Sequence, residues 1–331
     1  MLCCSFVFCN AEKMALEPGT VKFTVSMIYL ICLCSGKKVN DRPIIGVMSQ
    51  ETHGDLGKFG PSVVVASYVK LVESGGARVA LVKINQSMDY YIKMFNSING
   101  LIFPGGGQSD ILNSGYGKAA KIFFSMAVES NNKGDYFPIW GTCQGLLLLA
   151  AIVAGEDISG SVDCVNVAVP LKPTPDFVKS RIFDIKTPDC VLKALTTENS
   201  TYNHHKFSVT PKNFTKFGLD KFYRIISVNE GGNGLEFIST LEALDYPIYG
   251  IQWHPEKTLF EWNPHKDSAI PHFPNAVAVA QHVVNFLVSE ARKSHHRFSS
   301  EDEASKYLVY NYQPVYTGNV VSYELCYFLD M

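Results

Sequence analysis

The sequence predicts an α/β fold with a doubly wound, mostly parallel central sheet flanked by helices. Short apolar runs alternate with helical segments through the first half of the chain, beginning with Ile44–Ser49. These runs are apolar throughout, as in strands that are buried on both faces. Repeated strand–helix units make right-handed crossovers, which cover both faces of a parallel sheet with helices.

The first half contains the most regular pattern. Ser62–Gly75 has helical spacing and ends at a glycine pair. The other expected elements are strands at Ala77–Val82, Gly100–Phe103 and Phe137–Trp140, and helices at Met88–Asn96, Lys118–Ser130 and Leu146–Ala154. The last of these helices is apolar on all sides, which indicates that it is buried.

The second half is less regular. Its expected elements are strands at Ser161–Val169, Phe222–Asn229, Leu235–Thr240 and Ile248–Gln252, and a long helix at Asn275–Lys293. The last 30 or so residues are too aromatic for a disordered tail, so we expect them to lie against the domain. No repeat or composition break marks a second domain, and we expect one domain over residues 37–331.

Composition excludes several classes of protein. The 331 residues are 47% hydrophobic and 18% charged, which is typical of a globular chain with a large core. The formal net charge is −2, from 29 basic and 31 acidic residues, and no basic run is interleaved with aromatic residues. Nucleic acid is therefore not expected as the main partner.

Residues 1–36 have the layout of an N-terminal extension and a secretory signal peptide. Lys13 and Lys22 precede the apolar stretch Phe23–Cys34, and small residues follow it. This stretch is too short to span a bilayer comfortably, so stable membrane insertion is not expected. The alternatives are an N-terminal anchor or a buried helix, and Met14 is an alternative start.

Cysteine and asparagine patterns fit a secreted protein. Outside the extension the chain contains four cysteines with no C-x-x-C pair, so a zinc site has no support and we expect no metal: Cys143, Cys164, Cys190 and Cys326. Asn-x-Ser/Thr triplets predict glycosylation at Asn85, Asn199 and Asn213.

The segment Gly141-Thr142-Cys143-Gln144-Gly145 lies between a predicted strand and a predicted helix. A sharp strand-to-helix turn lifts a nucleophile clear of the sheet, and flanking glycines relieve crowding there. The positive end of the helix favours a thiolate and stabilises negative charge on a reacting carbonyl oxygen. A buried structural cysteine is the alternative.

A predicted strand ends at Trp253-His254-Pro255-Glu256. Strand ends in α/β sheets meet the ligand crevice, so His254 is a candidate base for the thiol, with Glu256 as the group that orients the imidazole. A structural histidine is the alternative.

Another strand ends in Pro104-Gly105-Gly106-Gly107. Adjacent glycines let a backbone N–H point into a site without obstruction. Gly106 or a neighbour would complete an oxyanion hole with the Gln144 N–H. A plain turn is the alternative, and the loop lacks the lysine and spacing of a nucleotide-binding motif.

The ordered motifs PGGG, GTCQG and WHPE resemble the class I glutamine amidotransferase-like superfamily. Within it the chain is similar to the gamma-glutamyl hydrolase family, through segments such as PIIGVMSQE, LIFPGGG, PIWGTCQG and YPIYGIQWHPEK. The resemblance runs from about Pro43 to the C-terminus. It implies cleavage of gamma-glutamyl bonds in folate and antifolate polyglutamates, no cofactor, a homodimer, and a lysosomal or extracellular location.

The same resemblance implies roles for single residues. Cys143 is the nucleophile, His254 the general base and proton donor, and Glu256 the third member of the triad. His205 matches a further active-site histidine, and its neighbour His204 is the alternative.

One departure from the family concerns the helix after the nucleophile. The family places acidic residues four and five positions after it, where this chain has Leu147 and Leu148. Leucine cannot bind an ammonium group. The alternative functions are therefore a secreted binding protein with a decayed site or a glutaminase-type amidotransferase domain.

Overall fold

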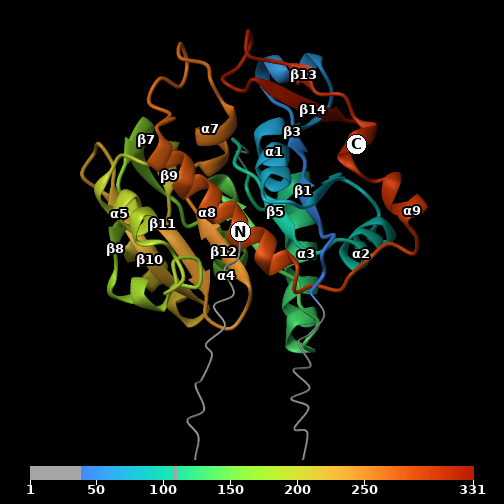
Figure 1. Cartoon of the computed structure of the whole chain (residues 1–331), viewed down its shortest axis with the longest axis horizontal. Coiled ribbons are helices and arrows are strands. Elements are labelled where there is room, and N and C mark those ends of the chain that lie inside the picture. The colour runs from blue at the N-terminus through green and yellow to red at the C-terminus, as the bar shows by residue number, and fades with distance from the viewer. Residues whose placement is uncertain (1–38, 108–109) are drawn as a thin grey trace, which may run out of the picture. The chain divides into compact units, whose positions relative to one another are not determined.

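A central sheet of eight strands organises the described part of the chain (Figure 1). The computed structural model describes residues 39–107 and 110–331, so the predicted signal peptide and the boundary at residue 36 lie outside the described residues. In spatial order the strands are β4 (Arg78–Val82), β1 (Ile44–Met48), β5 (Leu101–Phe103), β6 (Ile139–Thr142), β12 (Ile248–Ile251), β11 (Glu236–Ala243), β10 (Tyr223–Glu230) and β8 (Lys172–Pro173). The first five are parallel and the last three antiparallel.

Helices cover both faces of this sheet, and each face has its own apolar core. One face carries α2 (Met88–Ser97), α3 (Gly115–Asn132) and α4 (Gln144–Ala154). The other carries α1 (Ala66–Ser74), α5 (Asp189–Thr197), α7 (Pro255–Phe260) and α8 (Pro274–Ala291). The predicted α/β doubly wound fold with a mostly parallel sheet is confirmed.

A smaller antiparallel sheet corrects one expected helix. The segment Ser62–Val65 is strand β3, and the helix begins only at Ala66. β3 pairs with β2 (Gln50–Glu51) and with β14 (Leu325–Leu329), which also pairs with β13 (Val315–Tyr316). Three consecutive valines fit a strand, but the partner strand is about 260 residues away, so local spacing could not reveal it. The C-terminal residues therefore lie against the domain, as expected.

The sequence predicts one strand of a two-stranded antiparallel ribbon but not the other. β7 (Gly160–Val169) matches the expected strand, whereas its antiparallel partner β9 (Thr201–Ser208) was not expected. β9 contains four polar residues in sequence, from Asn203 to Lys206, and lacks the apolar pattern of a strand. The remaining helices are α6 (Pro211–Lys216), α9 (Glu301–Ser305) and short 3-10 turns at Gly54–Lys58, Pro175–Lys179, Leu219–Lys221 and Val309–Asn311.

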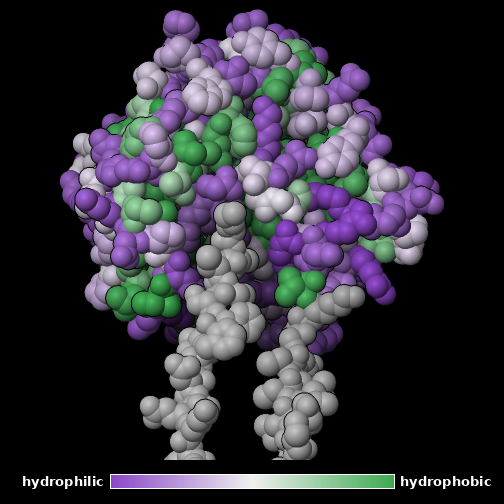
Figure 2. Space-filling view, in the orientation of Figure 1, coloured by the Kyte–Doolittle hydropathy of each residue, from purple (hydrophilic) through white to green (hydrophobic). Residues whose placement is uncertain are grey.

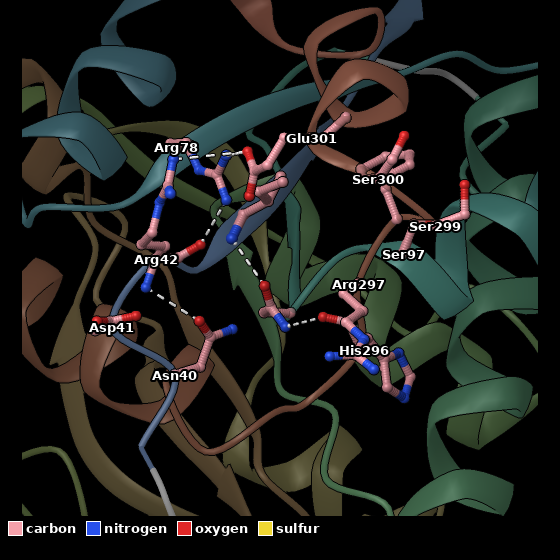
Figure 3. A pocket seen from close by; sticks show the side chains of 14 residues that line it. Asn40, Asp41, Arg42, Arg78, Ser97, His296, Arg297, Ser299, Ser300 and Glu301 are labelled. Atoms are coloured by element: carbon pink, nitrogen blue, oxygen red, sulfur yellow. Dashed lines mark hydrogen bonds and ion pairs between the residues drawn. The ribbon is translucent and has the colours of Figure 1, made fainter.

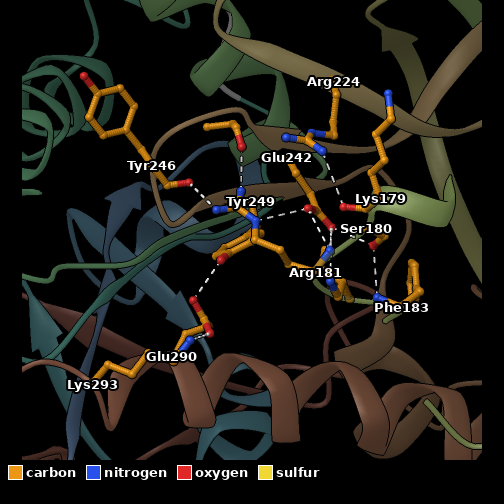
Figure 4. A network of polar contacts seen from close by, with 12 residues as sticks. Lys179, Ser180, Arg181, Phe183, Arg224, Glu242, Tyr246, Tyr249, Glu290 and Lys293 are labelled. Atoms are coloured by element: carbon orange, nitrogen blue, oxygen red, sulfur yellow. Dashed lines mark hydrogen bonds and ion pairs between the residues drawn. The ribbon is translucent and has the colours of Figure 1, made fainter. Parts of the chain in front are cut away.

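A buried carboxylate ties the connection between β8 and α5 to the central sheet (Figure 4). Glu242 on β11 is fully buried and accepts hydrogen bonds from the Ser180 hydroxyl at 2.7 Å and the Arg181 amide at 3.0 Å. The Arg181 guanidinium lies 4.7 Å from the ring centre of Tyr249 on β12. Burying a charge is tolerated here because hydrogen bonds and a cation satisfy it.

The surface mixes polar and apolar side chains on the face that Figure 2 shows, where the apolar ones form small separate groups. In the chain from residue 39 onward, apart from residues 108–109, no helix is both long and apolar enough for a bilayer crossing.

Candidate active site

Cys143 occupies a strained turn between β6 and α4. Its φ of 53° lies in the left-handed region, which non-glycine residues seldom adopt and which clusters at functional sites. The Cys143 amide donates to the Ile251 carbonyl at 2.7 Å, so the turn is fixed to the neighbouring strand β12. The first turn of α4 begins directly behind the thiol.

The two glycines of this turn are required by close backbone approach. A Cβ on Gly145 would lie 2.0 Å from the Phe103 carbonyl oxygen on β5. A Cβ on Gly141 would lie 2.6 Å from the Gly145 carbonyl carbon. The pattern G-x-C-x-G therefore reflects the packing of α4 against two parallel strands.

His254 follows β12 and precedes α7. Its Nδ1 lies 2.6 Å from Oε1 of Glu256, which is 1% exposed, and its imidazole also hydrogen-bonds the Cys143 side chain. Burial alone lowers the pKa of His254, but the Glu256 carboxylate and the negative charge on the Cys143 sulfur raise it to about 9. The ring is thus held between a thiol and a carboxylate and carries a proton at neutral pH.

The Gly-rich loop after β5 lies against these groups. A Cβ on Gly105 would lie 3.0 Å from Cε1 of His254 and 3.1 Å from Cβ of Cys143. The Gly105 amide donates to the Tyr68 hydroxyl at 2.8 Å. The Gly105 amide is therefore engaged, whereas Gly106, the next residue along, lines the same pocket as Gln144.

The side chains of Gln50 and Tyr116 fix the start of the Gly-rich loop by hydrogen bonds. The Pro104 carbonyl accepts from Nε2 of Gln50 at 3.1 Å and from the Tyr116 hydroxyl at 2.8 Å. Together with Tyr68 these are positioning residues that the sequence did not reveal. They come from β2, α1 and α3, and no motif connects them.

A pocket of about 570 Å³ opens above the thiol, and we name it the carboxyl-end pocket because it lies beyond the carboxyl ends of β5 and β6. Its lining residues are Gly106, Gly107, Ile111, Cys143, Gln144, Leu147, Asp157, Ser159, Val165, His204, His205, Lys206 and Phe207. Leu147 therefore faces the pocket, whereas Leu148 is fully buried in the core. Only the first of the two leucines alters the wall of the site.

Both histidines of the doublet on β9 reach this pocket. His205 is 7% exposed, its Nε2 lies 3.3 Å from Oδ1 of Asn203, and its ring meets Phe237 edge to face. Burial and, to a smaller extent, the neighbouring His254 lower the pKa of His205 to about 3, so the ring is neutral. The His254 amide donates to the Tyr202 carbonyl at 2.9 Å, which fixes β9 beside the site.

A second pocket, of about 580 Å³, lies at the opposite end of the sheet, before β1 and β4, and we name it the amino-end pocket. Figure 3 shows Arg42, Arg78 and Glu301 on one side of it and Ser299 and Ser300 on the other. Glu301 Oε2 lies 2.9 Å from Arg78 and 3.6 Å from Arg42. Within residues 39–107 and 110–331, no group of three His, Cys, Asp or Glu side chains is arranged to hold a metal ion.

Comparisons with known proteins identify a matching family and several similar proteins. The Peptidase C26 family matches residues 43–256. Gamma-glutamyl hydrolase of Rattus norvegicus is 43% identical over 89% of this chain and 92% of its own length, and that of Homo sapiens is 44% identical over 87% and 90%. A solved glutamine amidotransferase of Thermotoga maritima superposes with a TM-score of 0.41 and 11% identity, covering 76% of this chain and 98% of its own.

The fold, the thiol on its elbow and the matching peptidase family define the class: an enzyme that hydrolyses amide bonds with a cysteine nucleophile. Two mammalian relatives match it over nine-tenths or more of their own length. The chain belongs to the gamma-glutamyl hydrolase family.

Proposed function

We propose that this protein hydrolyses the gamma-glutamyl bonds of folylpoly-gamma-glutamates and of antifolate polyglutamates. The observation that carries the proposal is the imidazole of His254, which bridges the Glu256 carboxylate and the Cys143 sulfur, and Cys143 lines the carboxyl-end pocket. The family of the chain supports the same reaction.

The proposed mechanism has two chemical steps. The Cys143 sulfur attacks the gamma-carbonyl carbon as the thiolate that is paired with protonated His254, and the oxygen that becomes negative is stabilised by the Gly106 and Gln144 amides. The C–N bond then breaks as His254 gives its proton to the leaving amine, which yields a thioester. Water, deprotonated by His254, attacks the thioester, and the C–S bond breaks to release the acid and to restore the thiolate beside protonated His254. Glu256 holds the imidazole in orientation throughout.

The wall of the pocket supports a substrate that combines carboxylates with a flat apolar group. Lys206 and His204 supply positive or hydrogen-bonding groups. Val165 and Phe207 are 38% and 54% exposed, and together with Leu147 they make an apolar surface. An aromatic head group packs well on such a surface, and the carboxylates of a glutamyl chain need basic partners.

The test is hydrolysis of a pteroyl-oligo-gamma-glutamate by the purified mature chain beside Cys143→Ala, from acidic to neutral pH. Release of shorter glutamyl products by the wild type alone is expected. Glutamine is the comparison substrate, because a glutaminase-type domain would release ammonia from it. A folded wild type that cleaves neither substrate would overturn the proposal in favour of a binding protein.

We also propose a secretory route, with residues 1–36 removed and delivery to the lysosome and the medium. The exposed positions of Asn85 and Asn199 support glycan attachment there. Asn213 is half-buried and donates its side-chain amide to the Ile158 carbonyl at 2.8 Å, so we expect lower occupancy at this site. Glycopeptide mass spectrometry of the secreted chain tests this order, and light scattering tests the proposed homodimer.

A further inference from the structure

His204 differs from its neighbour in both exposure and partners. Its side chain is 37% exposed and lines the carboxyl-end pocket together with Cys143. Its Nδ1 lies 2.9 Å from Oδ1 of Asp267 and 3.0 Å from the Tyr202 hydroxyl. His205, in contrast, is almost fully buried, and its Nδ1 has no hydrogen-bond partner among the described residues.

Asp267 is an ionised group at the rear of the pocket wall. Its carboxylate is fully buried, and its Oδ2 accepts from Nζ of Lys257 at 3.0 Å. Burial by itself raises the pKa of Asp267, but the hydrogen bonds with His204 and Lys257 hold it well below its ordinary value. The nearby Asp267 carboxylate oxygen favours a proton on Nδ1, and the hydrogen bond between Nδ1 and the Tyr202 hydroxyl orients the ring.

The other charged side chains of the pocket provide few hydrogen-bond donors for a carboxylate of the substrate, so His204 could be one of them. Among the described lining residues, Asp157 is the one carboxylate, and Lys206 is the one side chain with a permanent positive charge. Leu147 contributes no charge from the elbow helix. Every residue of a gamma-linked glutamyl chain keeps a free α-carboxylate, and a carboxylate that enters a pocket needs hydrogen-bond donors.

We propose that His204, held beside Asp267, binds an α-carboxylate of the gamma-glutamyl substrate through Nε2–H as the imidazolium, since only the protonated ring has an N–H on both nitrogens, and so determines specificity for the free-acid form of that substrate. The inference rests on the proposed function, since it takes the gamma-glutamyl chain as the ligand. His204 does not touch the reacting bond. It acts on binding, and the expected effect is on KM rather than on kcat.

The first experiment compares two substrates in the wild type and in His204→Gln. One substrate has all its α-carboxylates free, and in the other the α-carboxylate on the acyl side of the scissile bond is a carboxamide. For the free acid, KM of the variant rises about tenfold or more while kcat changes less than about threefold, as for a lost charged hydrogen bond. For the carboxamide, KM is the same in both proteins.

Two further variants control for folding. His204→Phe keeps a flat ring without donors and is expected to raise KM for the free acid as His204→Gln does. His295→Gln changes an exposed histidine outside the pocket and leaves KM unchanged. Equal KM effects on both substrates, or a fall in kcat with KM unchanged, would overturn the inference.

A binding measurement separates this inference from the proposed function. Calorimetry with Cys143→Ala gives the Kd of the uncleaved oligo-gamma-glutamate with and without His204→Gln. A tenfold or greater weakening supports the role of His204 even if the wild type shows no turnover, which would overturn the proposed function alone. An unchanged Kd would reject the role of His204 whatever the turnover is.

Discussion

The two ends of the central sheet carry pockets of nearly equal volume, about 570 and about 580 Å³, with very different contents. At the carboxyl end, loops after three parallel strands bring a thiol, an imidazole and a glycine-rich loop together. At the amino end, arginines and serines surround Glu301 without a nucleophile aligned to a base (Figure 3).

The difference shows that pocket size does not locate a reaction. Parallel strands all deliver their following residues to one edge, and the helices that begin there direct their amide groups toward it. The residues before the strands lie near the start of the described chain, and at that end Arg42 and Arg78 pair with Glu301. Figure 2 shows strongly hydrophilic side chains in the region of α2 and α9.

The largest expected effect comes from removing the thiol. Cys143→Ala is expected to lower kcat/KM at least about 10⁴-fold, because no other group forms the thioester. Steady-state kinetics measures the change in kcat/KM, and far-ultraviolet circular dichroism checks that the variant is folded. The matched control is Cys190→Ala, which changes an exposed free cysteine and leaves kcat/KM as it is. Comparable loss in the control would contradict the assignment of the nucleophile.

The next effect concerns the carboxylate behind His254. Glu256→Gln removes a group that raises the pKa of this imidazole, and kcat/KM is expected to fall roughly 10²- to 10⁴-fold. In the wild type, activity that needs protonated His254 declines as pH rises through about 9. In the variant this alkaline limb moves to lower pH.

The control for that experiment is Glu236→Gln, an exposed carboxylate on β11. It is expected to leave the pH–rate profile unchanged. The same ionisation makes the stability of the fold depend on pH. Folding raises the pKa of His254, so the stabilisation that comes from its protonated ring is fully present below the pKa of a free imidazole and is lost as pH rises through about 9. An alkaline limb that stays in place in Glu256→Gln would reject the role of this carboxylate.

A smaller effect tests the packing that creates the elbow. Gly145→Ala puts a Cβ 2.0 Å from the Phe103 carbonyl, and it is expected to destabilise the fold by about 1–3 kcal/mol. Urea denaturation measures it. Gly57→Ala is the control, since no heavy atom lies within 4 Å of its added Cβ. Equal stability of the two variants would show that the elbow tolerates a side chain.

The smallest effect is expected at the amino-end pocket. Glu301→Gln removes the partner of Arg42 and Arg78, but the Glu301 side chain is 64% exposed. Exposed ion pairs contribute about 0–1 kcal/mol, so thermal denaturation is expected to shift little and kcat/KM not at all. A clear loss of activity would mean that the two ends of the sheet are coupled, which would contradict the view that only the carboxyl end takes part in the reaction.

The alternation of strands and helices in the first half could be predicted from the residues alone, because buried parallel strands are short apolar runs with glycine-rich ends. The sequence also placed Cys143, Gly106 and His254 at strand ends, which a parallel sheet must bring to one edge. The structure places these residues together, and their catalytic roles stay predictions for the experiments above. The family followed from the order of the motifs.

Only the tertiary structure decided which side chains surround that edge. The sequence predicts that Ser62–Val65 belongs to a helix, whereas its pairing with Leu325–Leu329 makes it a strand. Four residues of β9, from His204 to Phe207, line a pocket, so this strand lacks the apolar pattern by which periodicity could reveal it. The partnership of His204 with Asp267 joins a ribbon to a loop 63 residues further along the chain. Such contacts depend on how distant segments meet, and local propensity contains no information about them.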